Sequence, residues 1–237
     1  MKILAIDSTA TAASAAVLED DQLLGEFFIH TSFTHSQTLM PMVQNVLDCV
    51  GVSVNEIDLF AVAAGPGSFT GVRIGVASIK GMAMASGKPC VGVSALEAMA
   101  YNIALPGATV CAVMDARRDQ VYNAVFRLEK DQIKRITPDR AISIQDLLEE
   151  CKNYSQPLFL VGDGAKLCYN TNGFQELAVV LPPEPSQYQR AFGVGKAAFG
   201  AWQRGEAVTA SELLPIYLRL PQAERELKKR LENQKEG

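Results

Sequence analysis

The sequence predicts an α/β fold of two similar lobes, each with a mixed sheet flanked by helices. Each half of the chain opens with an apolar strand that ends in an acid, at residues 3–7 and 110–115. In each half, further strands follow through short polar turns, and helical patterns come after them. The 237 residues, 48% of them apolar, are enough for two substantial cores.

The first half adds strands at 14–18 and 22–29, and then a helix at 34–49. Pro41 lies inside this helix, so we expect it either to kink the helix or to mark its true first turn. A short apolar run around Val62 predicts a strand covered on both faces. Gly65-Pro66-Gly67 breaks that run, and a second helix starts near Gly71.

Small side chains line one face of this second helix. They lie at alternating steps of four and three residues and let another helix approach closely: Gly71, Gly75, Ser78, Met82 and Ala85. The loop before the helix is either a tight corner or an anion site at a helix N-terminus. It is not a phosphate-binding Walker A loop, because no Gly-Lys-Ser/Thr follows.

The second half predicts strands at 120–128, 132–136 and 158–161, and helices at 188–204 and after Ser143. Ser94 starts a capping-box sequence for a further short helix. Pro106-Gly107 marks the boundary between the halves. We therefore expect a first lobe at 1–104, a second at 105–205, and a segment at 206–237 that returns to the first lobe and ends in a charged tail.

This duplicated plan of a three-stranded meander, helices and further strands is similar to the actin-like (ASKHA) ATPase fold. A more specific resemblance lies in residues 65–75, GPGSFTGVRIG, which are similar to the signature of bacterial proteins that form threonylcarbamoyladenosine on tRNA. The opening IDST, residues 114–126 and residues 215–224 also resemble sequences of the smaller, TsaB (YeaZ) type. Together these motifs extend the resemblance over nearly the whole chain.

The resemblance implies a non-catalytic partner of the TsaD-type transferase, joined by a TsaE-type ATPase, with tRNA bound indirectly through the complex. The transferase family carries a metal-binding H-x-x-x-H pair. This chain has only His30 and His35, which lie five residues apart and would point about 140° apart on a helix. We therefore expect no metal, no cofactor and no catalytic residue.

The nucleotide site of actin-like kinases needs two phosphate loops. The first loop here, with Asp7, Ser8 and Thr9, is a degenerate candidate, and Asp7 is either functional or an ordinary strand-end acid. The second loop carries Ala116 and Arg117 where backbone N–H groups would need to be bare. The sequence thus predicts poor ATP binding.

We expect the partner to pack on the first-lobe helices, with a homodimer as the alternative when the partner is absent. The expected interface residues are Leu39, Met42, Val43, Val46, Gly71, Arg73, Gly75, Ser78 and Met82. On this view Gly75→Leu blocks pairing. Arg73 meets an acidic group or an anion, or forms a surface ion pair.

Composition and charge argue against several classes of function. The net charge of −4 argues against this chain alone gripping a nucleic acid. Five scattered cysteines with no C-x-x-C pair indicate reduced thiols in a cytoplasmic protein, and no apolar run is long enough to cross a membrane. Two alternatives stay open, a small-molecule kinase and a glycoprotease-like peptidase, although no G-x-S-x-G motif supports the second.

Overall fold

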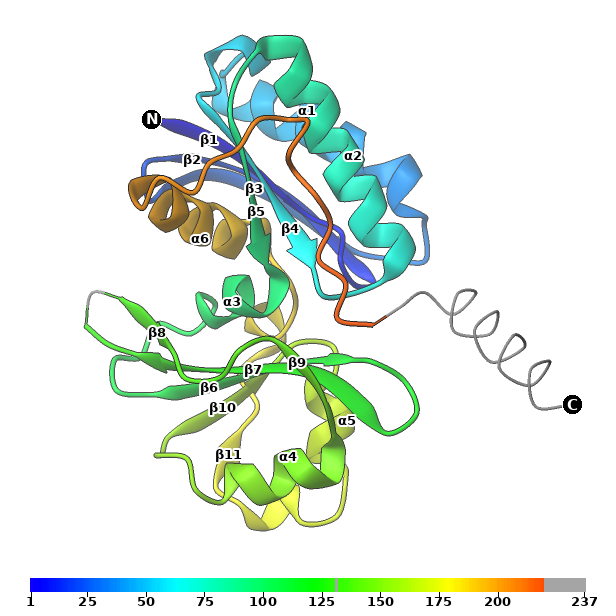
Figure 1. Cartoon of the computed structure of the whole chain (residues 1–237), viewed down its shortest axis with the longest axis vertical. Coiled ribbons are helices and arrows are strands. Elements are labelled where there is room, and N and C mark those ends of the chain that lie inside the picture. Colours follow the sequence, from blue (N-terminus) through cyan, green and yellow to red (C-terminus); the bar gives the residue numbers. More distant parts are fainter. Residues whose placement is uncertain (131, 220–237) are drawn as a thin grey trace, which may run out of the picture.

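The computed structural model describes residues 1–130 and 132–219. The expected charged tail from residue 223 lies outside these residues. Two lobes are stacked along the long axis of the molecule, each built on its own sheet (Figure 1).

The first sheet has five strands in the order β3-β2-β1-β4-β5. They are β1 (Lys2–Asp7), β2 (Ala12–Glu19), β3 (Gln22–His30), β4 (Leu59–Gly65) and β5 (Cys90–Ser94). The first three strands form an antiparallel meander, whereas β4 and β5 run parallel to β1. The mixed sheet predicted for this lobe is confirmed.

The second sheet repeats this order. Its strands are β6 (Thr109–Asp115), β7 (Gln120–Leu128), β8 (Ile133–Arg135), β9 (Arg140–Ser143), β10 (Leu158–Val161) and β11 (Val179–Val180). β7 is antiparallel to β6 and pairs with both β8 and β9, and β10 and β11 continue in parallel on the other side of β6. The duplication predicted from the two strand-end acids is therefore present in the topology.

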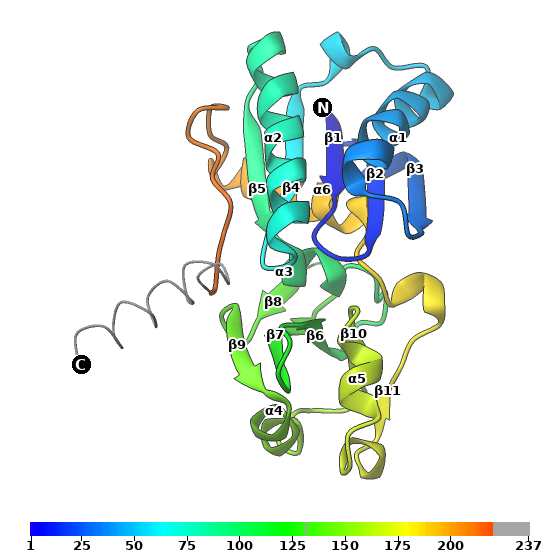
Figure 2. The same cartoon turned by 90° about the vertical axis from the view of Figure 1, so that its right-hand side faces the viewer.

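Two helices, α1 (His35–Val50) and α2 (Phe69–Ser86), cover one face of the first sheet, and α6 (Ala191–Gln203) covers the other (Figure 2). α1 begins at His35 after a cap in which the Thr34 N–H donates to Gln37 Oε1. Pro41 therefore lies inside the helix and does not mark its first turn. The second sheet packs against α4 (Ile144–Cys151) and α5 (Ala165–Tyr169).

Two helices, α3 (Ala95–Ala100) and α6, form the layer between the two sheets. The short α3 packs on β6 and β7 as well as on α6, while α6 packs on β1, β2, β4 and β5 of the first sheet. The chain thus re-enters the first lobe at α6, before the boundary expected at 206. This corrects the 105–205 lobe, because α6 is buried against the first sheet and belongs to it by packing. One continuous core runs through this layer and joins the two lobes.

Three 3-10 turns complete the described chain, at Val54–Glu56, Phe174–Glu176 and Glu184–Ser186. After α6 the chain runs back along α2, pairs Cys90 with Val208, and then descends toward the waist between the lobes (Figure 1). Within the described residues, no helix is both long enough and apolar enough to span a membrane.

Candidate functional site

A cleft of about 680 Å³ lies where the lobes meet. The turns after β1, β4, β6 and β10 reach it, together with the chain segment at 216–219. Aromatic and charged side chains from both lobes line it: His30, Phe69, Asp115, Arg117, Tyr122, Asp163, Tyr188, Tyr217 and Arg219.

The polar side chains of the turn after β1 are hydrogen-bonded to other groups of the chain. The N–H and the hydroxyl of Thr9 both donate to Asp7 Oδ1, at 2.8 and 2.7 Å. The Ser8 hydroxyl donates to the carbonyl of Gly71 at 2.9 Å, and the carbonyl of Thr9 accepts from the Ser68 N–H at 2.7 Å. The turn is thereby held against the start of α2.

Glycines make this close approach possible. A Cβ at Gly71 would overlap the carbonyl oxygen of Ser8, and a Cβ at Gly67 would overlap that of Thr9. Gly67 also has a φ of +158°, which side-chain-bearing residues rarely adopt. The glycine-rich loop is therefore explained by a tight corner, one of the two alternatives that the sequence left open.

Asp7 lies deep below this turn. It is fully buried, and its Oδ2 has no hydrogen-bond partner. Burial raises the pKa of Asp7 to about 6, although the hydrogen bonds from Thr9 oppose the rise. Burial also raises the pKa of Asp163, which accepts a hydrogen bond from Gln189 Nε2 at 3.2 Å. Repulsion from Asp163 adds a smaller part to the rise in the pKa of Asp7.

The turn after β6 has a different conformation. Arg117, Arg118 and Asp119 all have positive φ, at 64°, 57° and 54°. The Ala116 N–H donates to the carbonyl of Gln120 and the Arg117 N–H to Asp115 Oδ1. These two amides are already bonded within the chain and are therefore not free to bind nucleotide phosphates.

The two histidines have separate partners. The His30 ring lies 4.6 Å from that of Tyr188, and His35 Nε2 lies 2.7 Å from the carbonyl oxygen of Ala10. Within the described part of the chain, no group of three or more His, Cys, Asp or Glu residues is placed to hold a metal ion.

Arg73 packs on aromatic rings. Its guanidinium carbon lies 3.8 Å from the centroid of Phe69, and its Nε donates to Tyr217 Oη at 2.9 Å. Phe69 and Tyr217 are stacked at 5.0 Å. No carboxylate lies within ion-pair distance of Arg73 in the described residues, so the surface ion pair considered from the sequence is not formed there.

The structure places many of the expected interface residues in the core. The stripe on α1 is buried against the first sheet: Leu39, Met42, Val43 and Val46. Gly71 and Gly75 are buried too, and Gly75 faces Ser8 Oγ and Val62. Gly75→Leu would therefore disrupt the fold, which corrects its expected use as a probe of pairing.

The exposed face of α2 lies beside that buried stripe. Ser78 and Met82 are half-buried, Arg73 is exposed, and a second row of small residues, Ala77, Gly81 and Ala85, is exposed. A Cβ at Gly81 would meet nothing within 4 Å. The sequence contains this row at a spacing of four, but only packing shows which of the two rows faces outward.

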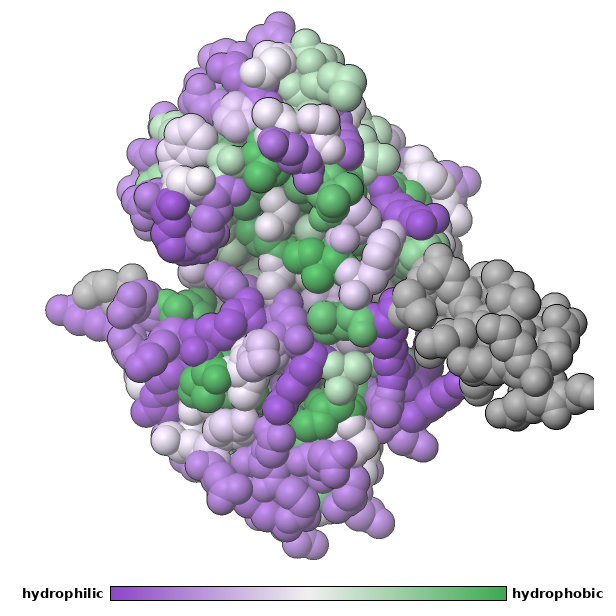
Figure 3. Space-filling model, in the orientation of Figure 1, coloured by the Kyte–Doolittle hydropathy of each residue, from purple (hydrophilic) through white to green (hydrophobic). Residues whose placement is uncertain are grey.

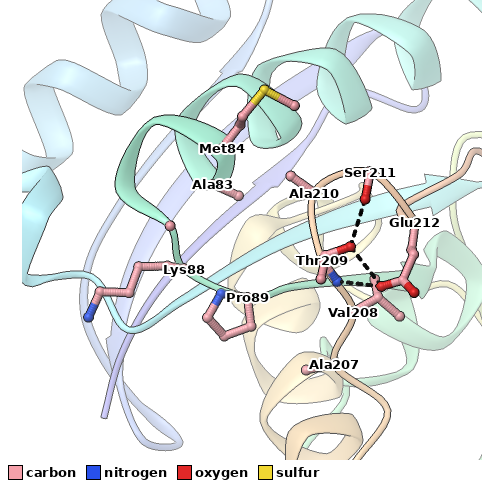
Figure 4. A pocket seen from close by; sticks show the side chains of 11 residues that line it. Ala83, Met84, Lys88, Pro89, Ala207, Val208, Thr209, Ala210, Ser211 and Glu212 are labelled. Atoms are coloured by element: carbon pink, nitrogen blue, oxygen red, sulfur yellow. Dashed lines mark hydrogen bonds between the residues drawn. The ribbon is translucent and has the colours of Figure 1, made fainter.

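A second hollow, of about 550 Å³, lies between the end of α2 and residues 207–212 (Figure 4). Thr209 is hydrogen-bonded there to both Ser211 and Glu212, so these polar groups of the hollow satisfy one another. Met84 beside it is 67% exposed. The groove lacks the cluster of aromatic and charged groups that lines the cleft, and we take the cleft as the candidate site.

Comparisons with known proteins agree with this architecture. A family model described as "TsaD: tRNA N6-adenosine threonylcarbamoyltransferase" matches residues 30–224. The tRNA threonylcarbamoyladenosine biosynthesis protein TsaB of Bacillus subtilis (strain 168) is 33% identical over 231 residues, which cover 94% of this chain and 96% of the relative. TsaB of Escherichia coli (strain K12) is 33% identical over 222 residues, which cover 92% and 95%.

Solved structures give the same result. YeaZ from Pseudomonas aeruginosa superposes with a TM-score of 0.72 at 29% identity, covering 92% of this chain and 99% of that one. The ethanolamine utilization protein EutJ from Carboxydothermus hydrogenoformans, at 14% identity and a TM-score of 0.52, shares the fold. The fold is thus that of the actin-like class. Within that class, the chain belongs to the TsaB/YeaZ family.

Proposed function

We propose that this chain is a cytoplasmic, non-catalytic subunit of the machinery that forms threonylcarbamoyladenosine on tRNA. It acts by binding a TsaD-type transferase, and a TsaE-type ATPase joins that pair. The names of its relatives, TsaB biosynthesis proteins, support the pathway. The bonded strand-end turns and the exposed face of α2 support its role as a partner.

One observation carries the non-catalytic role: several polar groups of both strand-end turns are already hydrogen-bonded inside the chain. Thr9 donates to Asp7, the Ser8 hydroxyl donates to the Gly71 carbonyl, and the amides of Ala116 and Arg117 donate to neighbouring residues. Phosphate loops work by leaving such N–H groups free to cradle oxygens. These turns stabilise the two-lobed scaffold instead.

The partner surface in this proposal is the exposed face of α2. Ala77, Gly81 and Ala85 lie one helical turn apart on it and hold no bulky side chain. The distance between packed helices depends on the side chains at the contact, so a small row allows close approach. A relative with the same helix, or a second copy of this chain, can pack there.

The test is Gly81→Leu, with Gly81→Ala and Gly75→Leu as matched controls. Leucine at 81 has open space in the free chain and a better helix propensity than glycine, so the fold should gain up to about 1 kcal/mol. Pairing with the TsaD-type subunit should weaken by about 1–3 kcal/mol, roughly 5- to 150-fold, by overpacking at the contact. Titration calorimetry measures the pairing and thermal unfolding measures the fold.

The Gly81→Ala protein should bind the TsaD-type subunit almost normally. Gly75→Leu should destabilise the fold itself, so any loss of binding by that variant should follow from unfolding. Undiminished pairing by a folded Gly81→Leu protein would place the contact elsewhere. Absence of pairing by the unsubstituted chain would remove the proposed function itself.

A further inference from the structure

Arginines that lack a carboxylate partner gather around the cleft. Four arginines elsewhere are paired with carboxylates: Arg135 with Glu97 and Asp139, Arg140 with Glu150, Arg190 with Glu26, and Arg204 with Glu206. Within residues 1–130 and 132–219, Arg73, Arg118 and Arg219 have no carboxylate at ion-pair distance, and neither does Arg127, which donates to Thr109 Oγ1. Arg219 lines the cleft, Arg73 contacts the lining residues Phe69 and Tyr217, and Arg118 follows the lining residue Arg117 in the chain. We call the edge of the cleft at these residues the cleft mouth.

Two of the three are fixed in place by neutral groups. Arg73 stacks on Phe69 and donates to Tyr217. Arg219 donates through Nη1 to the carbonyl oxygen of Ala116 at 2.8 Å, with its guanidinium carbon 5.9 Å from the ring centroid of Tyr122. Their positive charge is therefore held at a defined position but not neutralised.

The third, Arg118, is displayed by the turn after β6. Three successive side-chain-bearing residues with left-handed backbone cost conformational energy, and such strain persists where the surroundings impose it. The turn also presents Arg117, whose side chain is 85% exposed although it pairs with Asp115 at 3.1 Å. The mouth thus carries four arginines, Arg73, Arg117, Arg118 and Arg219, on a chain with a net charge of −4.

Three acids accompany these four arginines at the cleft. Asp115 is paired with Arg117, and Asp163 lies mostly buried on the floor and accepts from Gln189. Asp119 is exposed in the same turn. The rim that a partner would meet first is therefore positive overall.

Aromatic surface accompanies this charge. Tyr217 is 39% exposed and stacked on Phe69, and the nearby Leu214 and Ile216 are exposed as well. Figure 3 shows several hydrophobic residues on this face of the molecule, near the waist between the lobes. Guanidinium groups interleaved with aromatic rings bind single-stranded nucleic acid, since each base has a face to stack and each nucleotide has a phosphate.

We infer that the cleft mouth, formed by Phe69, Arg73, Arg118, Tyr217 and Arg219, contacts an unpaired loop of the tRNA directly. This inference rests on the proposed function, which brings tRNA to the complex. It adds a contact by this chain itself, made within the assembly, where the transferase supplies the remaining affinity.

The experiment uses the complex of this chain with a TsaD-type subunit and an unmodified tRNA transcript. Arg118→Glu changes an exposed side chain and leaves the packing intact. A double variant, Arg118→Gln and Arg219→Gln, removes two unpaired charges of the mouth and keeps Arg73, which lies on the exposed face of α2. The matched control changes two exposed lysines of the second lobe to Gln: Lys134 and Lys166. Fluorescence anisotropy gives the tRNA Kd at several salt concentrations, and calorimetry gives the pairing of the subunits.

We expect the double variant to raise the tRNA Kd about fivefold and to lower the slope of log Kd against log salt by about 1.5. Arg118→Glu should show an effect of similar size and the lysine control none, with subunit pairing unchanged in all three. An unchanged Kd and slope with intact pairing would overturn the inference while the proposed function stands. Loss of subunit pairing in Arg118→Glu would also overturn it, because the mouth would then bind an acidic protein surface.

Discussion

The two lobes begin with the same structural unit, a strand ending in an acid, but the turns that follow have opposite designs. After β1, Asp7, Ser8 and Thr9 are buried and bonded to one another and to α2. After β6, Arg117, Arg118 and Asp119 are exposed in left-handed conformations. The strand order is the same in both halves, but the first turn is part of the core and the second turn lies at the surface.

This difference separates scaffold from recognition. The first turn holds α2 in place through backbone contacts that glycine alone permits, so it fixes the helix that carries the proposed partner face. The second turn lies at the surface, and its exposed side chains Arg117, Arg118 and Asp119 carry charge. Substitutions in the first should change stability, and substitutions in the second should change binding.

The largest expected effect is Gly71→Ala. Its methyl group would overlap the carbonyl oxygen of Ser8, so either α2 or the turn must shift. We expect a loss of about 3–5 kcal/mol in the free energy of unfolding, at the upper end of overpacking effects. Urea denaturation measures it. Gly81→Ala, in the same helix but in open space, should instead gain up to about 1 kcal/mol. Equal behaviour of the two variants would refute the packing described for the first turn.

Asp7→Asn should act through charge. The folded pKa of Asp7, about 6, lies above its usual value of 3.8, so the folded state binds more protons than the unfolded state between these pH values. Asp7 therefore makes stability fall as pH rises from about 4 to about 6, and the loss persists above that. Asparagine keeps an acceptor for Thr9 and removes the charge, so the variant should be about 2–3 kcal/mol more stable at pH 7.

The measurement compares unfolding of both proteins from pH 4 to pH 7. Their difference in stability should grow through this window, and at pH 4 it should nearly vanish. A constant difference across the window would mean that Asp7 does not titrate there.

The smallest effect belongs to the second turn. Arg118→Gly relieves a left-handed backbone and should raise the free energy of unfolding by about 0.5–1 kcal/mol. The same change removes a charge from the cleft mouth, so tRNA binding by the complex should weaken as stability rises. A variant that loses stability would show that the Arg118 side chain supports the turn.

Much of this fold follows from sequence pattern. The strand-end acids, the capping serines Ser94 and Ser143, and the run at 158–161 place their elements nearly to the residue, since these signals are local. The packing of α6 on the first lobe could not be predicted in this way. Its small residues, such as Gly193 against Ala98 and Gly195 against Leu18, indicate close packing but do not name the surface that they meet.

The site was harder to predict for the same reason. Helix α2 has two rows of small residues, and the sequence does not show that Gly71 and Gly75 face the core while Ala77 and Gly81 face outward. Tyr217 and Arg219 lie far along the chain from Arg73 and Ala116, their partners in the fold. Only the three-dimensional arrangement brings them to one cleft.

The central claim is that this chain supports, but does not perform, the transfer to tRNA. The most direct measurement is a reconstitution from tRNA, a TsaD-type subunit, a TsaE-type ATPase and a source of the threonylcarbamoyl group, with this chain present, absent, or substituted as Gly81→Leu. The account predicts modified adenosine only when the chain is present and able to pair, and none when it replaces the TsaD-type subunit. Full modification without the chain, or modification by the chain alone, would contradict it.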